Sequence, residues 1–221
     1  MIWRGTRSEI RALEALNKQL ALLGERLHVV LGDHDNYDVI DALLRNGPGV
    51  LWMGPHLALL PRSSLVRADQ HSVGRLAGAA SFDRCVRMPG LTWWEAELPT
   101  DEQAAGLLDA GASPDVVLAH EALMVPGLIQ RLGDSHGWRP DDLAYAREAQ
   151  QVHTAQVLSV LDPAKETLCV AGHYHFRHSE QAVLDGMPVR QEIFDRDDAA
   201  DPLAVLDLDD DVPRFEAAAM G

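Results

Sequence analysis

A short apolar run that ends in two histidines constrains this chain more than any other stretch. Residues 168–172 read Leu-Cys-Val-Ala-Gly, and His173 and His175 follow with one tyrosine between them. A run of β-formers that stops at a glycine predicts a buried strand, so both imidazoles leave its carboxyl end together. Ligands bind at that edge of open α/β sheets, and imidazole is the commonest metal ligand in proteins. The pair predicts half of a metal site; two solvated loop histidines are the alternative.

Two further apolar runs end in residues of the same kind. Leu27–Leu31 reads as a buried strand that runs directly into Gly32-Asp-His-Asp35, and Asp115–Ala119 is followed by His120. If these are parallel strands of one sheet, their polar ends meet the histidine pair at one rim. Carboxylate and imidazole ligands together suit Mn, Fe or Zn, whereas structural zinc sites usually contain thiolates.

Helical patterns flank these predicted strands. Residues 8–24 carry leucine and isoleucine at helical spacing, with Ser8 placed to cap the start and Gly24 to end the helix. A second long helix is expected from about Asp142 to Leu161, before Pro163. Helices that alternate with buried strands indicate an α/β fold, here a single domain over residues 1–221.

The other strands are expected to be short and antiparallel. Four β-type segments between Val50 and Ala80, the last of them Leu76–Ala80, are separated by glycine and proline, which favours hairpins. Asp185-Gly186 predicts a hairpin turn between two later β segments. The expected architecture is therefore one of mixed sheets packed together, with helices outside.

Composition narrows the class of partner and the compartment. The net charge of −15, from 34 acidic and 19 basic residues, disfavours binding to duplex nucleic acid or to an anionic membrane. Cys85 and Cys169 give no disulfide framework, which fits a reducing cytosol. The chain contains no long uncharged apolar run and no apolar signal-peptide core, so we expect a cytoplasmic protein.

Ser81–Trp94 is a long irregular stretch that is rich in arginine and tryptophan. Because functional residues often lie on such loops, its arginines are candidates for lining a substrate site. The alternative is that Trp93 and Trp94 close the core over the edge of the sheet.

Taken together, these motifs resemble those of the calcineurin-like metallophosphoesterase superfamily, in particular a bacterial branch of it. The family's later motifs are Gly-Asn-His-Asp/Glu, a strand ending in His, and Gly-His-x-His, and the matching segments here stand in the same order: residues 32–35, His120 and residues 172–175. The resemblance implies an α/β/β/α sandwich of mixed sheets flanked by helices, with two divalent metal ions in an intact member.

The resemblance also implies a role for each matching residue. Asp33, where the family has Asn, would bind one metal ion together with His120 and His173, and His175 would belong to the other ion. His34 would contact the phosphate or protonate the leaving oxygen, and Asp35 would orient His34. A carboxylate in place of an amide at position 33 is compatible with metal binding and adds charge.

One departure from the family pattern concerns its first two motifs, Asp-x-His and Gly-Asp-x-x-Asp/Gly, which this chain lacks. Met1–Gly5 looks like the segment that follows the second motif, so about 30 or more residues of a βαβ unit would be missing, a truncation of the N-terminus. With those ligands absent, we expect at most one metal ion in this chain.

The resemblance implies hydrolysis of a phosphate mono- or diester by metal-activated water, with a small phosphorylated substrate. The alternative is an inactive family remnant that acts as a metal-binding or protein-interaction module. A plain α/β protein without metal is a third possibility. Any sheet edge left open by missing strands would favour pairing with another chain.

Overall fold

The computed structural model describes residues 6–45, 50–108, 113–133, 138–196, 199, 204–209 and 213–217, so Met1–Gly5 lies outside the described residues. The helices are α1 (Arg7–Leu23), α2 (Tyr37–Arg45), α3 (Asp101–Ala105), α4 (Pro126–Gly133) and α5 (Pro140–Leu158), with 3-10 turns at Arg84–Val86 and Glu95–Glu97. The strands are β1 (Leu27–Val29), β2 (Leu51–Trp52), β3 (Leu57–Leu59), β4 (Ser63–Ala68), β5 (His71–Leu76), β6 (Val116–Ala119), β7 (Thr167–Ala171), β8 (His178–Leu184), β9 (Met187–Ile193), β10 (Ala204–Asp207) and β11 (Arg214–Ala217).

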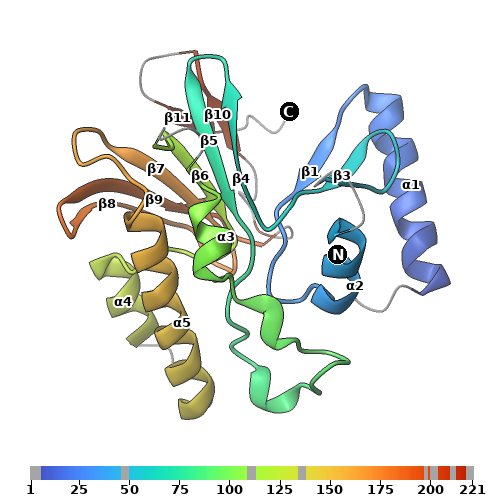
Figure 1. The fold of residues 1–221 in the computed structure, drawn as a ribbon, viewed down its shortest axis with the longest axis horizontal. Helices are drawn as coiled ribbons and strands as arrows, with labels where there is room; N and C mark the ends of the chain where they lie inside the picture. Colours follow the sequence, from blue (N-terminus) through green and yellow to red (C-terminus); the bar gives the residue numbers. More distant parts are fainter. Residues whose placement is uncertain are drawn as a thin grey trace.

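The largest sheet has six strands in the order β4-β5-β6-β7-β9-β8. Its four central strands are parallel, and β4 and β8 pair antiparallel with β5 and β9 at the two edges. A second mixed sheet contains β1, β3 and β2, with β1 parallel and β2 antiparallel to β3. The chain is thus a mixed α/β structure with two mixed sheets flanked by helices, as expected from the sequence (Figure 1).

Both faces of the six-stranded sheet are covered. Along β6 and β7 the side chains alternate between two core clusters, as the pleat requires: Val117 and Cys169 join one cluster, Val116 and Leu168 the other. The first cluster includes residues of α4 and α5, which lie together against this sheet in Figure 1. The second includes Leu206 of β10 together with a side chain of β11, so that hairpin covers the opposite face.

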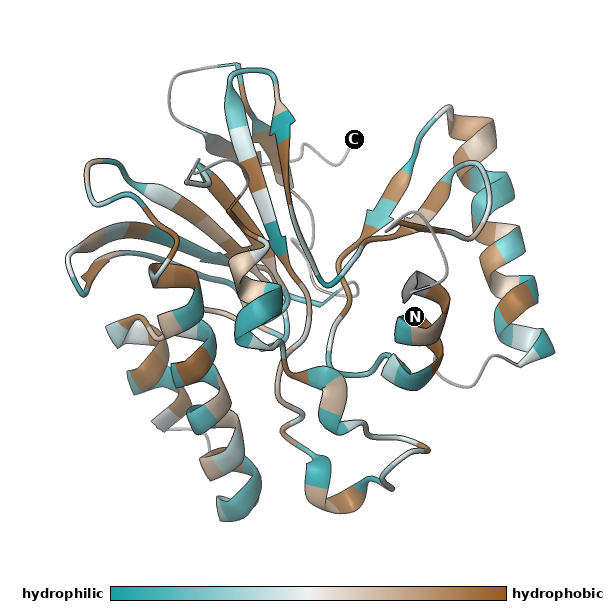
Figure 2. Ribbon diagram, viewed as in Figure 1, coloured by the Kyte–Doolittle hydropathy of each residue, from teal (hydrophilic) through white to brown (hydrophobic). Residues whose placement is uncertain are grey.

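The smaller sheet has its own core. Tyr37 and Ile40 of α2 are fully buried against Leu31 and Leu59, and α1 packs against β3 on the outside. Because each element buries only part of its surface, hydrophobic and hydrophilic residues alternate along the strands and helices, as Figure 2 shows. The Gly78 amide donates a hydrogen bond to the Leu31 carbonyl over 2.9 Å, which joins the end of β1 to the segment after β5.

Most predicted elements are confirmed, with shifted ends. Thr6 rather than Ser8 caps α1, because its side chain accepts from the Glu9 amide in a reciprocal capping box; Gly24 ends the helix with φ at 73°. The hairpin turn at Asp185-Gly186 is confirmed between β8 and β9. The expected helix over Asp142–Leu161 is α5, which begins and ends earlier.

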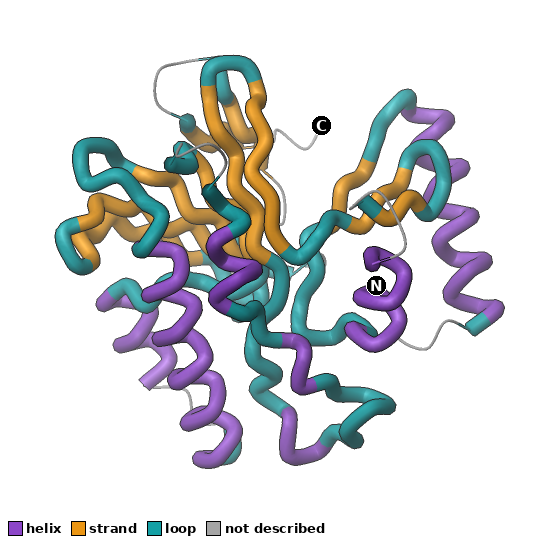
Figure 3. Tube along the Cα trace, in the orientation of Figure 1, coloured by secondary structure: helices purple, strands orange, loops and turns teal. Residues whose placement is uncertain are grey.

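The predicted strand over Leu76–Ala80 is wrong. The strand is His71–Leu76, and beyond it the Ala77 amide donates to the Arg62 carbonyl. Gly78 then takes φ 104°, a conformation open to glycine, and a Cβ there would collide with the Glu97 carbonyl oxygen. The chain therefore leaves the sheet at residue 77 and enters a long connection to α3 that is mostly loop in Figure 3.

Among the described residues, no helix has the length and apolar character that crossing a membrane requires.

Candidate metal centre

Asp33 lies in a turn that is held by hydrogen bonds to both the amide and the carbonyl of Gly32. The Asp35 side chain accepts a hydrogen bond from the Gly32 amide over 3.0 Å, and the Tyr37 hydroxyl donates to the Gly32 carbonyl over 2.7 Å. Tyr37 is itself fully buried in the core of the small sheet. The carboxylate of Asp33, only 4% exposed, thus projects from a fixed turn at the carboxyl end of β1.

His120 and His173 follow the adjacent parallel strands β6 and β7. The Gly172 amide donates to the His120 carbonyl over 3.3 Å, which continues the strand pairing by one residue, and the two rings lie 5.0 Å apart. Past the strand, His173 and His175 take φ values of 69° and 54°, a left-handed conformation that is rare outside glycine. Such backbone is tolerated where the surroundings fix it, commonly at functional sites.

The predicted convergence of Asp33, His120 and His173 is confirmed. One ligand atom from each lies within 4.8 Å of the other two. The Asp33 Oδ1 atom is 3.1 Å from His120 Nε2 and 3.6 Å from His173 Nδ1. One buried carboxylate and two imidazoles, drawn from both mixed sheets, therefore form a group that could hold a metal ion.

The contacts of His173 indicate which of its nitrogens would face a metal. Nε2 lies 3.1 Å from the Ala80 carbonyl, which can only accept, so Nε2 carries the proton in the neutral ring. The lone pair is then on Nδ1, the atom beside Asp33. A backbone carbonyl that fixes the tautomer in this way is the usual outer partner of a metal-binding histidine. The donor set thus fits a divalent cation.

Electrostatics within the cluster favour a charged Asp33. Burial alone would raise the pKa of this carboxyl, but its contacts with His120, His173 and His34 lower the pKa below the ordinary value. For His173, burial acts to lower the pKa, and the hydrogen bond to Asp33 with the nearby charge of Glu121 outweighs it, so the pKa is raised. Protons and a metal ion would therefore compete for His173.

A cavity of about 800 Å³ opens above the cluster. His34, Asp35 and His175 line it together with the three clustered residues. His175 is exposed and does not belong to the three-residue group, so it stands apart from Asp33 within the described structure. Asp35 is buried and accepts the bond from the Gly32 amide, and its expected role of orienting His34 stays a prediction.

His34 lies between Asp33 and Arg87, one of the arginines of the irregular stretch Ser81–Trp94. Its Nε2 is 3.1 Å from Asp33 Oδ2, and the Arg87 Nη2 atom is 2.9 Å from its Nδ1. The same Arg87 Nη2 atom is 2.6 Å from His34 Nε2, so the guanidinium lies against both ring nitrogens. Arg87 is in turn held by its contacts with Asp83 and with the Thr92 carbonyl.

A further buried set supports Asp33 from behind. The Ser81 hydroxyl, 3.4 Å from Asp33 Oδ2, donates to Glu97 over 2.6 Å, and the Ser81 amide and the Tyr145 hydroxyl also donate to Glu97. Glu97 is fully buried. Sequence reasoning missed Ser81, Glu97 and Tyr145 because they come from a loop and a distant helix; only the irregular Arg-rich stretch after β5 hinted at such a role.

That stretch, Ser81–Trp94, contributes to the core and also reaches the cavity, while a role of its arginines in substrate binding stays a prediction. Trp94 is buried in the core of the small sheet, and its indole nitrogen donates to Asp38 over 3.1 Å. Trp93 is half-buried beside Tyr145. Arg87 meanwhile reaches His34 at the cavity.

A scan against models of protein families gives no match for this chain, and a search of curated proteins also gives none.

Proposed function

We propose that this protein is a metal-dependent phosphoesterase whose ion is held by Asp33, His120 and His173. The observation that carries the proposal is the convergence of these three ligands at the floor of an open cavity that His34 also lines. The order of the sequence motifs supports membership of the calcineurin-like metallophosphoesterase superfamily. We therefore also propose that the two mixed sheets form the α/β/β/α sandwich of that family.

A divalent ion such as Mn, Fe or Zn would supply Lewis acidity and lower the pKa of a water molecule near the phosphate. Arg87, although ion-paired with Asp83, places a guanidinium beside the cavity that can donate to an anionic substrate. His34 is 62% exposed at its side chain and lines the cavity, so its protonated form can donate a proton to a leaving oxygen.

A second candidate function is a metal-binding module without turnover. It is favoured by the position of His175, which stays exposed outside the cluster, so that the described residues provide one group of three ligands. Three protein ligands suffice for a mononuclear site, but a single imidazole does not make a second one. We therefore propose at most one ion per chain.

Hydrolysis of an aryl phosphate mono- and diester with added manganese tests the first candidate. Chelator should abolish the rate, and His34→Ala should lower it about 10²- to 10⁴-fold, the usual contribution of a general acid. Metal content should remain at one ion in His34→Ala and fall to none in His120→Ala. His28→Ala, at an exposed position on β1, is the matched control for both measurements.

The outcomes separate the two candidates. One bound ion with no ester hydrolysis would favour the metal-binding module. Hydrolysis that survives both chelator and His34→Ala would place the chemistry outside this cavity.

A further inference from the structure

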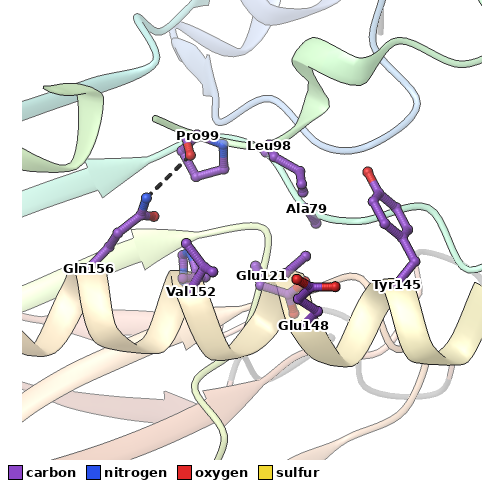
Figure 4. Close-up of a pocket in the computed structure, with 11 residues that line it drawn as sticks. Ala79, Leu98, Pro99, Glu121, Tyr145, Glu148, Val152 and Gln156 are labelled. Atoms are coloured by element: carbon purple, nitrogen blue, oxygen red, sulfur yellow. Dashed lines mark hydrogen bonds between the residues drawn. The ribbon is translucent and has the colours of Figure 1, made fainter. Parts of the chain in front are cut away.

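A second cavity, of about 300 Å³, lies along α5 and shares no lining residue with the cavity above the metal cluster. One wall is a single face of the helix, since Tyr145, Ala149, Val152 and Gln156 follow one another at intervals of four, three and four residues. Figure 4 shows Ala79, Leu98 and Pro99 across from this face. The size is at the small end of ligand pockets, and the walls are mostly apolar.

Two buried polar atoms of α5 lack hydrogen-bond partners in the part of the chain that the structure describes. They are Nδ1 of His153 and Oε1 of Gln156, and both residues line the cavity. The Gln156 Nε2 atom donates to the Pro99 carbonyl and to Asp101, at 3.3 and 2.9 Å, which fixes the amide so that Oε1 can only accept. In Figure 4 this oxygen points away from Pro99 toward the cavity.

His153 can also accept, through one of its two ring nitrogens. Burial lowers the pKa of His153, against the opposing influence of the Glu121 charge, so the imidazole is neutral and one of its nitrogens carries a lone pair. A buried acceptor without a donor is unfavourable, so Gln156 Oε1, and His153 Nδ1 in the tautomer protonated at Nε2, favour a ligand or water that can donate.

Glu121 adds a charge to the same cavity. Its carboxylate is 2% exposed and accepts from the Ala122 amide and the Tyr174 hydroxyl, but no ion pair with a cation forms in the described structure. Glu148 lies at the exposed side of the cavity. The missing counterpart is therefore a positively charged donor, because a buried charge without a partner is unfavourable.

We propose that this cavity binds a small primary amine with an apolar body. The ammonium group would donate to Gln156 Oε1 and His153 Nδ1 and balance Glu121, while the apolar part would contact Ala79, Leu98 and Val152. Anionic molecules are disfavoured by the two glutamates. A metal ion is disfavoured as well, because among the described residues only the Asp33 cluster brings three ligand atoms together.

Calorimetric titration with three probes of similar shape tests the proposal: 2-phenylethylamine, 2-phenylethanol and phenylacetate. The amine should bind saturably, the alcohol about 10-fold more weakly or worse for loss of the charge interaction, and the acid not at all. Glu121→Gln should remove the preference for the amine over the alcohol. The same titration of His120→Ala should match the unsubstituted protein, which separates this site from the metal cluster.

A variant that fills the cavity tests the proposal by a change that should leave the protein folded. Val152→Phe places a larger ring at a half-exposed lining position and should weaken amine binding about 10-fold or more, with an unchanged thermal midpoint. Gln151→Phe, on the exposed surface of the same helix, should bind the amine normally. The proposal would be overturned by equal affinity for the amine and the alcohol, by undiminished amine binding in Val152→Phe, or by no amine binding at all. The last result would leave water as the only occupant of the cavity.

Discussion

Gly32 lets the His120 ring lie directly against the turn that carries Asp33. A Cβ at position 32 would come within 2.8 Å of the His120 Cδ2 and Nε2 atoms, and φ at Gly32 is not in the left-handed region. The requirement is therefore one of space alone. Gly32→Ala should push the ring away from Asp33 and lower metal affinity about 10- to 100-fold, as loss of a ligand's supporting contact does.

Titration of the apoprotein with zinc measures this change. Gly133→Ala is the matched control, because a Cβ at the end of α4 meets nothing within 4 Å and should leave zinc affinity unaltered. Equal zinc affinity in Gly32→Ala and the unsubstituted protein would mean that His120 is not a ligand or that its ring has room to move.

At the scale of single residues, the sequence predicted the candidate metal ligands better than the side chains around them. Asp33, His120 and His173 could be predicted because each follows an apolar strand, and parallel strands share an edge. For Arg87 the sequence indicated only that the arginines of Ser81–Trp94 line a site, and it did not indicate Glu97. The path of this irregular connection depends on tertiary contacts such as the bonds of Ser81 to Glu97.

Among the elements, most strands were predictable, but their exact ends and the strand β5 were not. Residues 71–76 include His71, Ser72 and Gly74, which do not form an apolar run, yet they make a buried strand between β4 and β6. Pairing on both sides outweighs weak local propensity there. The helix α4 was missed for a similar reason, since its eight residues are too few to show a clear period.

Asp115 holds three elements together at the end of the sheet remote from the metal cluster. Its carboxylate accepts from the Ser72 amide and hydroxyl, at 2.7 and 2.9 Å, and from Lys165 at 2.6 Å. Burial raises the pKa of Asp115, but these donors outweigh it and the pKa is lowered. The stabilisation is therefore present above the ordinary pKa of 3.8 and is lost as pH falls through the lower folded value.

Asp115→Asn should accordingly cost about 1–2 kcal/mol of unfolding free energy at pH 7, the range for hydrogen bonds to a charged group at a partly exposed site. The deficit relative to the unsubstituted protein should shrink below about pH 4, because the unfolded chain then takes up a proton at Asp115 that the native carboxylate, with its lowered pKa, still resists. Urea unfolding at pH 7 and pH 3 checks both points, with the exposed turn residue Asp69→Asn as control. A deficit that is the same at both pH values would show that charge plays no part.

For the whole molecule, the ligand cluster is a point where the two mixed sheets meet. Asp33 comes from the end of β1 in the three-stranded sheet, whereas His120 and His173 end strands of the six-stranded sheet. The backbone bond from Gly78 to Leu31 is a second link nearby. An ion bound by all three ligands would thus stabilise the relative arrangement of the sheets as well as the site itself.

Metal binding should therefore raise the thermal midpoint of the entire chain in a single transition. Free zinc at a hundred times its dissociation constant adds about 2.7 kcal/mol, or roughly 5 to 10 °C for a chain of this size. The shift should be reversed by chelator, absent in His120→Ala and kept in His28→Ala, with one ion per chain by elemental analysis.

An equal shift in His120→Ala would mean that zinc acts through the acidic surface instead, and two tightly held ions would mean that His175 gains partners outside the cluster. A shift confined to one of two separate transitions would mean that the cluster stabilises only one sheet.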